Sequence, residues 1–445
     1  MQERNGDGAV SPRSGFAGWI AALLLLAAAS PVYAQIGLLQ TPNLGLPSVP
    51  GRLPGIGDID VLALRSVDRA LQAPSRLTGL VRRSGGALDV DPDGWPVVAA
   101  EIVVVDLSAA ARIEAVRAGF TVLREERLEA LGLEVVVLAP PRRLPLSRAM
   151  ARLRALDPGA EVSFNHVYVP AGETSARPGP LPETPAPPGT QTSSAQLGLI
   201  DTGVEATHPA LVGARITQRG FAGPPRVGAH GTAVASLMVG QSGVFAGADP
   251  GAGLLVADIY GGQPAGGSST GLAQALAWMV EQDARVVNIS LVGPRNGLVE
   301  RAVARAQALG LILVAASGND GPAAPPLYPA AYEGVIGVSA VNGRGRILPE
   351  TGRGPHVDFV APGADMAAAG QAGTWTRVRG SSFAAPLVSG LIARRGGGAQ
   401  AVQALVRTAA DMGAPGRDPI YGAGLVGAGL RVEPGAVGAR GQLSR

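Results

Sequence analysis

The chain has 445 residues, no cysteine and no lysine, so arginine supplies all of its basic side chains. Without cysteine, neither disulfides nor thiolate metal sites can hold the fold together. Aromatic residues make up 4% of the chain and there are 4 histidines, which limits the supply of general bases and metal ligands. The formal net charge of +3 is too small over this length to predict nucleic-acid binding. His166 and His356 have no partners at metal-ligand spacing, so we predict no zinc site.

Long apolar runs are also rare outside one N-terminal segment. Residues 16–29 follow Arg13 and precede Ser30-Pro31-Val32-Tyr33-Ala34. The run is too short to cross a bilayer comfortably, and the pattern is typical of a signal peptide over residues 1–34, cleaved after Ala34. A core helix or an uncleaved anchor is the alternative. With cleavage, the mature chain is expected to be a secreted or periplasmic bacterial protein without membrane contact.

Composition divides the rest of the chain into segments. Residues 35–95 are rich in Pro and Gly, and we predict them to be mostly flexible, with one short helix near residues 60–72. Apolar periodicity in residues 96–170 predicts the order β-α-β-β-α-β, which is a small α+β, ferredoxin-like sandwich. Residues 171–195 read as a Pro-rich linker, and residues 433–445 as a flexible tail.

Between residues 196 and 432, short Val- and Ile-rich strands alternate with helical patterns. This alternation predicts an α/β fold with a doubly wound parallel sheet and helices on both faces. Ligand sites in such sheets lie at the carboxyl ends of the strands, where Asp201 and Asn319 are expected. The predicted strands are residues 196–200, 253–259, 286–289, 311–315, 335–339 and 357–360.

Three short motifs carry residues suited to amide hydrolysis. Asp201 ends a buried strand before Thr-Gly, His230 begins a small-residue helix, and Ser382 lies in Gly-Ser-Ser-Phe-Ala-Ala-Pro before an apolar helix. Each has an ordinary alternative: a turn residue, a structural histidine and a helix cap. A serine in the first turn of a helix is, however, well placed to act as a nucleophile, because the helix end favours negative charge.

In this order the motifs resemble those of the subtilisin-like serine peptidases, the subtilases of peptidase family S8. That family has Asp-[Ser/Thr]-Gly, His-Gly-Thr and Gly-Thr-Ser-Met-Ala-x-Pro, and the resemblance extends over nearly all of residues 196–432. It implies a serine endopeptidase with Ser382 as nucleophile, His230 as general base and Asp201 orienting the histidine. The side-chain amide of Asn319 and the backbone N–H of Ser382 would form the oxyanion hole.

The resemblance also implies partners. Protein or peptide substrates are expected, and residues 96–170 resemble the inhibitory prosegment that precedes such domains and lays its last strand in the active cleft. The linker after it would be the place of self-cleavage. As an isolated domain, this segment could instead bind almost anything.

Residues matching the family's substrate-binding segments give an expected specificity. Ser290, Leu291, Val292 and Gly293 correspond to the strand that pairs with substrate, and Val292 is expected to restrict bulky side chains in the outer subsites. The wall of the S1 pocket, which holds the residue before the cut bond (P1), would be Ala316, Ser317 and Gly318. Leu327 would shorten that pocket and favour Ala or Val at P1.

Departures from the family's motifs are Ser381 for Thr, Phe383 for Met and Ala233 for His, and we expect activity to survive them. No cofactor is expected; many family members bind calcium, but residues 239–247, where one such site usually lies, hold no carboxylate. Two alternatives to a general endopeptidase remain: a protease dedicated to one partner, and a non-catalytic binding protein of the same fold. The presence of all the catalytic residues argues against the second.

Overall fold

The computed structural model describes residues 77–174 and 196–439. The predicted signal peptide, the predicted helix near residues 60–72 and the end of the predicted tail lie outside these ranges. In the described residues, no helix is both long and apolar enough to cross a membrane.

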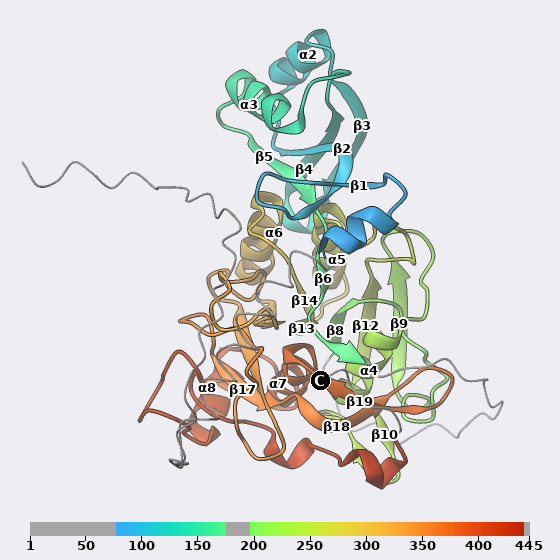
Figure 1. Ribbon diagram of the computed structural model, residues 1–445, viewed down its shortest axis with the longest axis vertical. Helices are drawn as coiled ribbons and strands as arrows, with labels where there is room; N and C mark the ends of the chain where they lie inside the picture. Colours follow the sequence, from blue (N-terminus) through green and yellow to red (C-terminus); the bar gives the residue numbers. More distant parts are fainter. Residues whose placement is uncertain (1–76, 175–195, 440–445) are drawn as a thin grey trace, which may run out of the picture. The chain divides into compact units, whose positions relative to one another are not determined.

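A seven-stranded sheet forms the centre of the larger domain, residues 196–439, in the order β17-β16-β15-β13-β8-β12-β9 (Figure 1). Every neighbouring pair is parallel, as the sequence predicted. Its strands are β8 (Gln196–Asp201), β9 (Arg215–Gly220), β12 (Gly253–Asp258), β13 (Val286–Ile289), β15 (Ile312–Ala316), β16 (Ile336–Val341) and β17 (Phe359–Pro362). The edge strand β9 was not predicted, because its sequence, Arg-Ile-Thr-Gln-Arg-Gly, lacks the apolar run of the other strands in this sheet.

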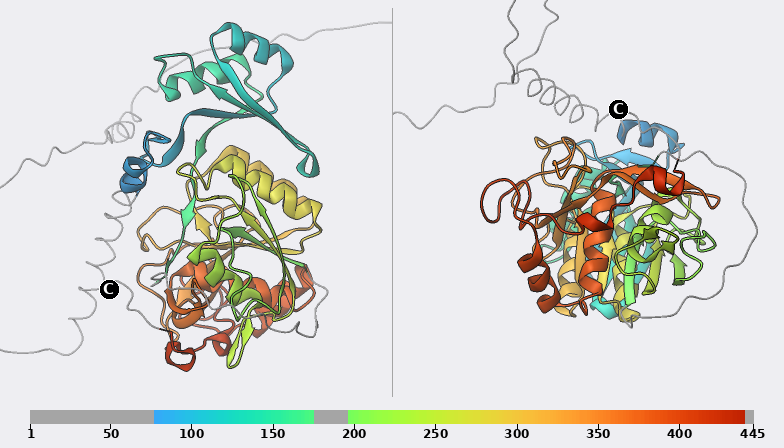
Figure 2. Two further views of the ribbon diagram at one scale, coloured as in Figure 1. Left: turned by 90° about the vertical axis from the view of Figure 1, so that its right-hand side faces the viewer. Right: turned by 90° about the horizontal axis from the view of Figure 1, so that it is seen from below.

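Helices cover both faces of this sheet (Figure 2). One apolar core contains side chains of α4 (Ala229–Val239), α7 (Ser381–Ala393) and α8 (Ala399–Thr408). A second core contains side chains of α5 (Ser269–Glu281) and α6 (Gly297–Ala308). Along β8, Leu199 belongs to the first core and Ile200 to the second, because successive side chains of a strand point to opposite faces.

An upstream domain precedes the larger domain, and residues 96–166 contain the predicted β-α-β-β-α-β order. Antiparallel pairing gives the sheet order β5-β2-β4-β3, and β1 adds to the first half of β2. The elements are β1 (Leu88–Val90), β2 (Pro96–Val105), α2 (Ala109–Arg117), β3 (Thr121–Leu128), β4 (Leu133–Ala139), α3 (Leu146–Leu156) and β5 (Glu161–His166).

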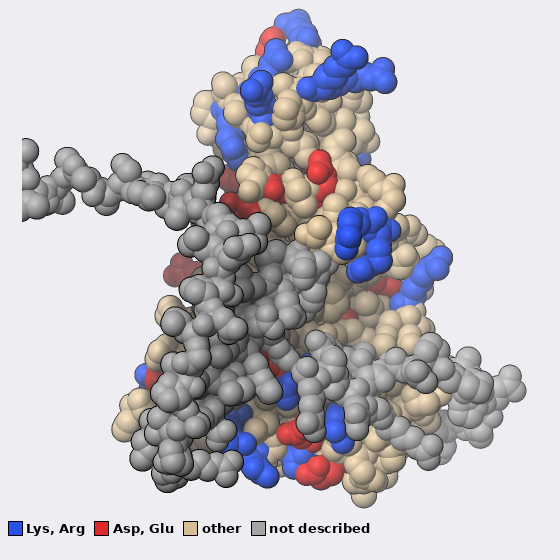
Figure 3. Space-filling model, in the orientation of Figure 1, with Lys and Arg blue, Asp and Glu red and all other residues tan. Residues whose placement is uncertain are grey.

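The two faces of this small sheet have different partners. One face forms a separate core with α2 and α3. The other face, which includes Val103, Val105 and Val135, packs in the same core as α5 and α6 of the larger domain. Exposed arginines gather at the end of the domain that carries α2 and α3 (Figure 3), including Arg142, Arg148 and Arg152.

Residues 77–95 differ from the flexible segment that was predicted for 35–95. Residues 77–83 are helical, and β1 pairs with β2. The turn between these strands is held by Asp91, whose carboxylate accepts the backbone N–H groups of Asp93 and Trp95 at 2.9 and 2.7 Å. Because these hydrogen bonds are local, a segment rich in Gly and Pro still adopts one conformation here.

The last strand of the order predicted for residues 96–170 is two strands in the structure. β5 ends at His166, and the chain then enters the larger domain, where β6 (Val169–Pro170) pairs antiparallel with β14 (Leu291–Val292). Further on, β7 (Glu173–Thr174) pairs with β19 (Trp375–Arg379), which also pairs with β18 (Ala364–Ala369). Residues 171–174 were assigned to the linker, but they lie in this paired segment and Ala171 is buried.

Candidate active site

Asp201 and His230 form a buried pair at the carboxyl end of the sheet. Asp201 ends β8 and is completely buried, and both of its carboxylate oxygens lie within 2.9 Å of His230 Nδ1. Asp201 Oδ1 also accepts the backbone N–H of Thr202 at 2.7 Å. These contacts leave Nε2 as the imidazole nitrogen that faces away from the carboxylate. Among the described residues, this buried Nε2 has no hydrogen-bond partner.

Ser382 lies in the first turn of α7, where the sequence placed it. Its hydroxyl donates to the carbonyl oxygen of Ser290 at 2.9 Å, and the side chain is completely buried. Gly380, just before the helix, has φ +133°, and a Cβ there would lie 2.6 Å from Asn319 Nδ2, so glycine is needed at this turn.

Asn319 and Ser382 both donate hydrogen bonds to one carbonyl oxygen, that of Ala171. The backbone N–H of Ser382 donates at 3.1 Å, and the donor from Asn319 is its side-chain amide Nδ2. The amide is oriented by Ser381, whose backbone N–H donates to Asn319 Oδ1 at 3.0 Å. Two donors converging on one carbonyl oxygen is the geometry that an oxyanion hole requires.

The chain around Ala171 is held on both sides of this carbonyl. Before it, Ala171 N donates to Ser290 O at 3.2 Å and Tyr168 N donates to Gly267 O at 2.7 Å, so the segment lies between two backbone edges. After it, β7 pairs with β19. Residues 168–174 therefore cross the site as an extended peptide, in the manner expected of a bound substrate.

Tyr168 fills a deep pocket, three residues before Ala171. The side chain is completely buried, and its hydroxyl donates to the carbonyl oxygen of Pro294 at 3.1 Å. A Cβ at Gly293 would lie 2.6 Å from the Tyr168 ring, so the pocket depends on that glycine. The Tyr168 ring packs over Gly293, the residue after Val292. The restriction that Val292 is expected to place on substrate side chains stays a prediction.

Three of the residues predicted to form the S1 pocket, Ala316, Ser317 and Leu327, are buried. Leu327 and Ala171 belong to the same apolar core. Gly318 has φ +93°, and a Cβ there would collide with Leu327 Cδ1, so the Leu327 side chain packs against Gly318. The assignment of these residues to the S1 pocket stays a prediction.

Comparison with known proteins agrees with this geometry. A family model described as the subtilase family matches residues 192–424, which is more than half of the chain. The chain belongs to the subtilase family. Its relatives show that this subtilase is a serine endopeptidase of the subtilisin type.

Two relatives and one solved structure indicate the extent of the likeness. Thermitase from Thermoactinomyces vulgaris is 30% identical over 230 residues, which are 49% of this chain and 82% of thermitase. Subtilisin Savinase from Lederbergia lenta is 32% identical over 253 residues, 53% of this chain and 90% of that protein. Fervidolysin from Fervidobacterium pennivorans, described as a keratinolytic enzyme related to subtilisin, has TM-score 0.64 at 22% identity. That likeness covers 78% of this chain and 63% of fervidolysin, and it shows the fold alone.

Sequence reasoning missed several residues that position the catalytic groups of this subtilase. Asn288 Nδ2 donates to Ser290 Oγ at 2.8 Å, and that hydroxyl donates to the carbonyl oxygen of Ser382 at 2.8 Å. Ser389, two turns further along α7 than Ser382, donates to Asn288 Oδ1 at 3.2 Å. Thr202 Oγ1 accepts the backbone N–H of Gly231 at 2.9 Å and so ties the helix of His230 to the strand of Asp201. Asn288 lies within the residues that resemble the family, and this resemblance is the sequence signal that could have identified it.

No cluster of three or more His, Asp or Glu side chains suited to a metal ion occurs in residues 77–174 and 196–439. The segment from residue 239 to 247 offers no carboxylate, so its side chains do not fit the calcium site usual there. His208 is buried in a structural role: Nε2 donates to Thr374 O at 2.8 Å, and Nδ1 accepts the backbone N–H of Ala210 at 3.0 Å. Burial lowers the pKa of His208 and keeps it neutral.

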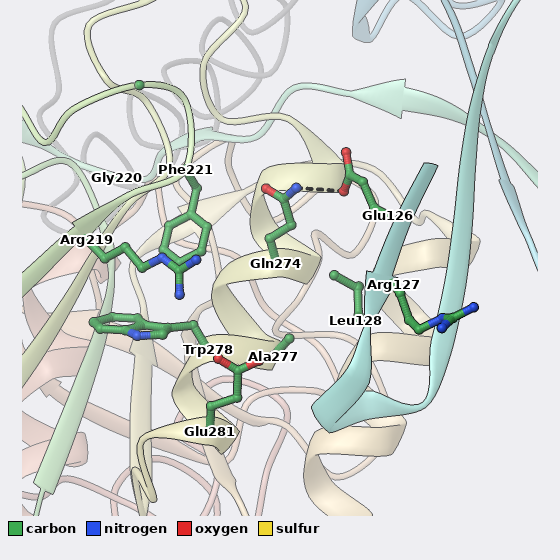
Figure 4. A pocket seen from close by; sticks show the side chains of 11 residues that line it. Glu126, Arg127, Leu128, Arg219, Gly220, Phe221, Gln274, Ala277, Trp278 and Glu281 are labelled. Atoms are coloured by element: carbon green, nitrogen blue, oxygen red, sulfur yellow. Dashed lines mark hydrogen bonds between the residues drawn. The ribbon is translucent and has the colours of Figure 1, made fainter. Parts of the chain in front are cut away.

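A separate open pocket lies between β3 and the peptidase domain, away from the catalytic residues (Figure 4). Glu126 on β3 accepts a hydrogen bond from Gln274 on α5 at 2.6 Å across it. The Arg219 guanidinium lies 5.2 Å from the centre of the Phe221 ring, and that ring packs against Trp278. The Glu126–Gln274 hydrogen bond joins the upstream domain to α5, whereas Arg219, Phe221 and Trp278 all belong to the domain of residues 196–439. No serine or histidine lines this pocket.

Proposed function

We propose that the chain is made as an inactive proprotein of a secreted or periplasmic endopeptidase. In this proposal Ser382 attacks the substrate carbonyl, His230 accepts and returns the proton, and Asp201 holds the imidazole in the required tautomer. Asn319 and the backbone N–H of Ser382 stabilise the charge that develops on the carbonyl oxygen. The upstream domain, residues 96–170 together with the packed segment from 77 to 95, acts as the intramolecular inhibitor.

The observation that carries the proposal is the position of the Ala171 carbonyl oxygen. It accepts from both proposed oxyanion donors, while the segment before it fills the cleft. A substrate peptide would need the same backbone edges, so the upstream domain and a substrate cannot occupy the cleft together. The large apolar contact with α5 and α6 keeps the segment in place until the chain is cut.

The proposed location rests on the N-terminal sequence pattern. Residues 1–34 have the composition of a signal peptide, which predicts export. The family alone does not fix the compartment, since a relative is the major intracellular serine protease of Bacillus subtilis, 29% identical over 220 residues. Mass spectrometry of the chain recovered from cell fractions of a bacterial host tests it. An exported chain beginning at Gln35 supports export, and a cytoplasmic chain that keeps Met1 overturns it.

The catalytic assignment is tested with the full chain, the Ser382→Ala variant and the Ser381→Ala variant. We expect the wild type to split into two fragments and to be labelled by a fluorophosphonate probe. The Ser382→Ala variant should stay intact and unlabelled. Ser381→Ala is the matched control, because it removes the neighbouring hydroxyl and leaves the nucleophile, so it should still be labelled. Labelling of Ser382→Ala would show that another residue is the nucleophile and would overturn the assignment.

A protease dedicated to one partner is the second candidate function. The observation that favours it is the fit of the internal peptide, since Tyr168 is enclosed and Ala171 is buried. Digestion of casein distinguishes the two: a general endopeptidase produces many fragments, and a dedicated one produces few or none while still splitting its own chain.

A further inference from the structure

One peptide bond, between Ala171 and Gly172, is presented to Ser382. The carbonyl oxygen of Ala171 lies between the two oxyanion donors. On the other side of the bond, a Cβ built on Gly172 would lie 3.1 Å from Ser382 Cβ, which places Gly172 directly beside the nucleophile. The strand pairings before and after this bond fix the register, so neighbouring bonds are not aligned with the hydroxyl.

The space for the residue after this bond is closed by Phe383. A Cβ on Gly172 would lie 2.6 Å from Phe383 Cε2 and 3.2 Å from Cδ2, closer than real carbon contacts allow. Phe383 is completely buried, and its ring packs against the His230 ring with centroids 5.2 Å apart. The ring therefore cannot move aside without disturbing the catalytic base or the core.

We propose that the protein cuts its own chain between Ala171 and Gly172, and that Phe383 restricts the residue after the cut bond (P1′) to glycine. The inference rests on the function proposed above and extends it to a named bond and to a substrate class. Substrates of this class carry a small residue at P1 and glycine at P1′. The Phe383 side chain, which stands where the family usually has methionine, thus becomes the residue that sets specificity on the leaving side.

The reaction consumes one water molecule. Ser382 Oγ bonds to the carbonyl carbon of Ala171 as its proton passes to His230 Nε2. The bond from that carbon to the Gly172 nitrogen then breaks, and the nitrogen takes the proton from His230 and leaves as the amine. Water, deprotonated by His230, next hydrolyses the Ala171 ester, which frees Ser382 and leaves a carboxylate at Ala171.

The sequence makes the predicted product easy to recognise. Residues 171–195 contain three glycines, and Gly179 and Gly189 each follow proline, so Ala171–Gly172 is the one Ala–Gly bond in that stretch. Cleavage there gives a fragment that begins Gly-Glu-Thr-Ser.

The first test uses the full chain as wild type, Gly172→Ala and Gly172→Ala combined with Phe383→Met. N-terminal sequencing and intact mass are expected to give a wild-type fragment that begins at Gly172. Gly172→Ala should split about tenfold to a hundredfold more slowly, because its methyl group overlaps Phe383, and Phe383→Met should restore much of the rate, because the flexible side chain can yield. A fragment beginning elsewhere, or a Gly172→Ala chain that splits at the wild-type rate, would overturn the proposal.

A second test does not depend on folding of the Gly172→Ala chain. Wild-type enzyme is given the quenched peptides Tyr-Val-Pro-Ala-Gly-Glu and Tyr-Val-Pro-Ala-Ala-Glu, and kcat/KM is compared. Glycine should be preferred by about tenfold or more in the wild type, and this ratio should shrink several-fold in Phe383→Met. Equal rates for the two peptides in the wild type would overturn the role of Phe383.

Labelling separates the failure of this inference from failure of the proposed function. If wild-type enzyme is labelled by fluorophosphonate at Ser382 but is cut at another bond, the proposed peptidase function stands and cleavage between Ala171 and Gly172 is overturned. If wild-type enzyme is folded but is neither labelled nor cut, both the proposed peptidase function and the proposed cleavage site are overturned.

Discussion

The amide oxygen of Asn319 accepts the backbone N–H of Ser381 at 3.0 Å, and this contact turns the amide nitrogen toward the Ala171 carbonyl oxygen. The Asn319 side chain therefore contacts α7 through its oxygen and donates to the Ala171 carbonyl oxygen through its nitrogen. Because the first contact is with the backbone of α7, the position of the amide is tied to the helix that carries Ser382.

Removal of the Asn319 donor should lower turnover far more than substrate affinity. For Asn319→Ala we expect kcat to fall about a hundred- to a thousandfold with little change in KM, a range known for the corresponding donor of a subtilisin, a relative of this protein. Asn319→Asp is the matched control, since it keeps the shape but cannot donate while ionised. Both variants should be impaired in peptide hydrolysis after cleavage by added wild-type enzyme. If kcat is unchanged and KM rises, Asn319 binds substrate and does not stabilise the oxyanion.

The Tyr168 pocket predicts a preference at P4, three residues before P1. In peptides of the form X-Val-Pro-Ala, replacing Tyr by Phe should lower kcat/KM about five- to tenfold, because the half-buried Pro294 carbonyl loses its donor. Replacement by Ala should lower it about a hundredfold or more, because the pocket is left empty.

The matched control for this pocket is Gly293→Ala in the enzyme. Its Cβ would lie 2.6 Å from the tyrosine ring, so the variant should lose the Tyr and Phe preference and keep its activity on peptides with Ala at P4. A variant that still prefers Tyr would show that the pocket lies elsewhere.

Sequence was sufficient for the parts of the site that short local patterns encode. Asp201, His230 and Ser382 each lie in a motif of a few residues, and the strand β8 and the helices α4 and α7 that carry them lie where the sequence predicted a strand and two helices. The occupied cleft was not foreseeable in the same way. Ala171 is buried only because Ser290, Asn319 and Ser382, more than a hundred residues away, supply its hydrogen-bond partners. In composition alone, residues 171–174 resemble the Pro-rich linker that follows.

The length of a side chain is readable from sequence, but its direction is not. Val292 was expected to close the outer subsites, yet the adjacent Gly293 is the residue that faces the Tyr168 ring and leaves room for it. Phe383 stands where the family usually has Met, and the sequence alone does not show which residue its ring contacts. In the folded chain the ring lies against Gly172, which is more than two hundred residues away in sequence. Both cases turn on contacts between segments that are distant in sequence.

Leu327 should control the size of the P1 residue. Because the side chain is buried in the same core as Ala171, Leu327→Ala enlarges the pocket and should raise kcat/KM for peptides with Leu or Phe at P1 about tenfold relative to Ala. The cavity should also destabilise the domain by about 2–5 kcal/mol. Cleavage of a P1 peptide library by both enzymes measures the change. A wild-type preference for Phe, Tyr or Leu would contradict the assignment of Leu327.

Stability should fall in mildly acidic solution because His208 is buried in its neutral form. Burial is the main cause that lowers its pKa, outweighing the opposing contributions of the Thr374 carbonyl and the Glu205 carboxylate, and its Nδ1 is occupied by the Ala210 N–H. The unfolded chain therefore binds a proton at higher pH than the folded chain. The stabilisation is fully present above about pH 6.5 and is lost as the pH falls through the lower pKa of the folded state.

The slope contributed by His208 is at most about 1.4 kcal/mol per pH unit. We expect urea denaturation of the Ser382→Ala chain, which cannot digest itself, to show decreasing stability from pH 7 to pH 5. Adding His208→Gln should lower the stability at pH 8, where the neutral imidazole makes both hydrogen bonds, and should flatten the decline below pH 6.5. His356, whose pKa is also lowered by burial, is the matched second site, and its Gln variant should flatten the decline independently. An unchanged slope in the double variant would show that the acid sensitivity arises from carboxylates and not from buried neutral histidines.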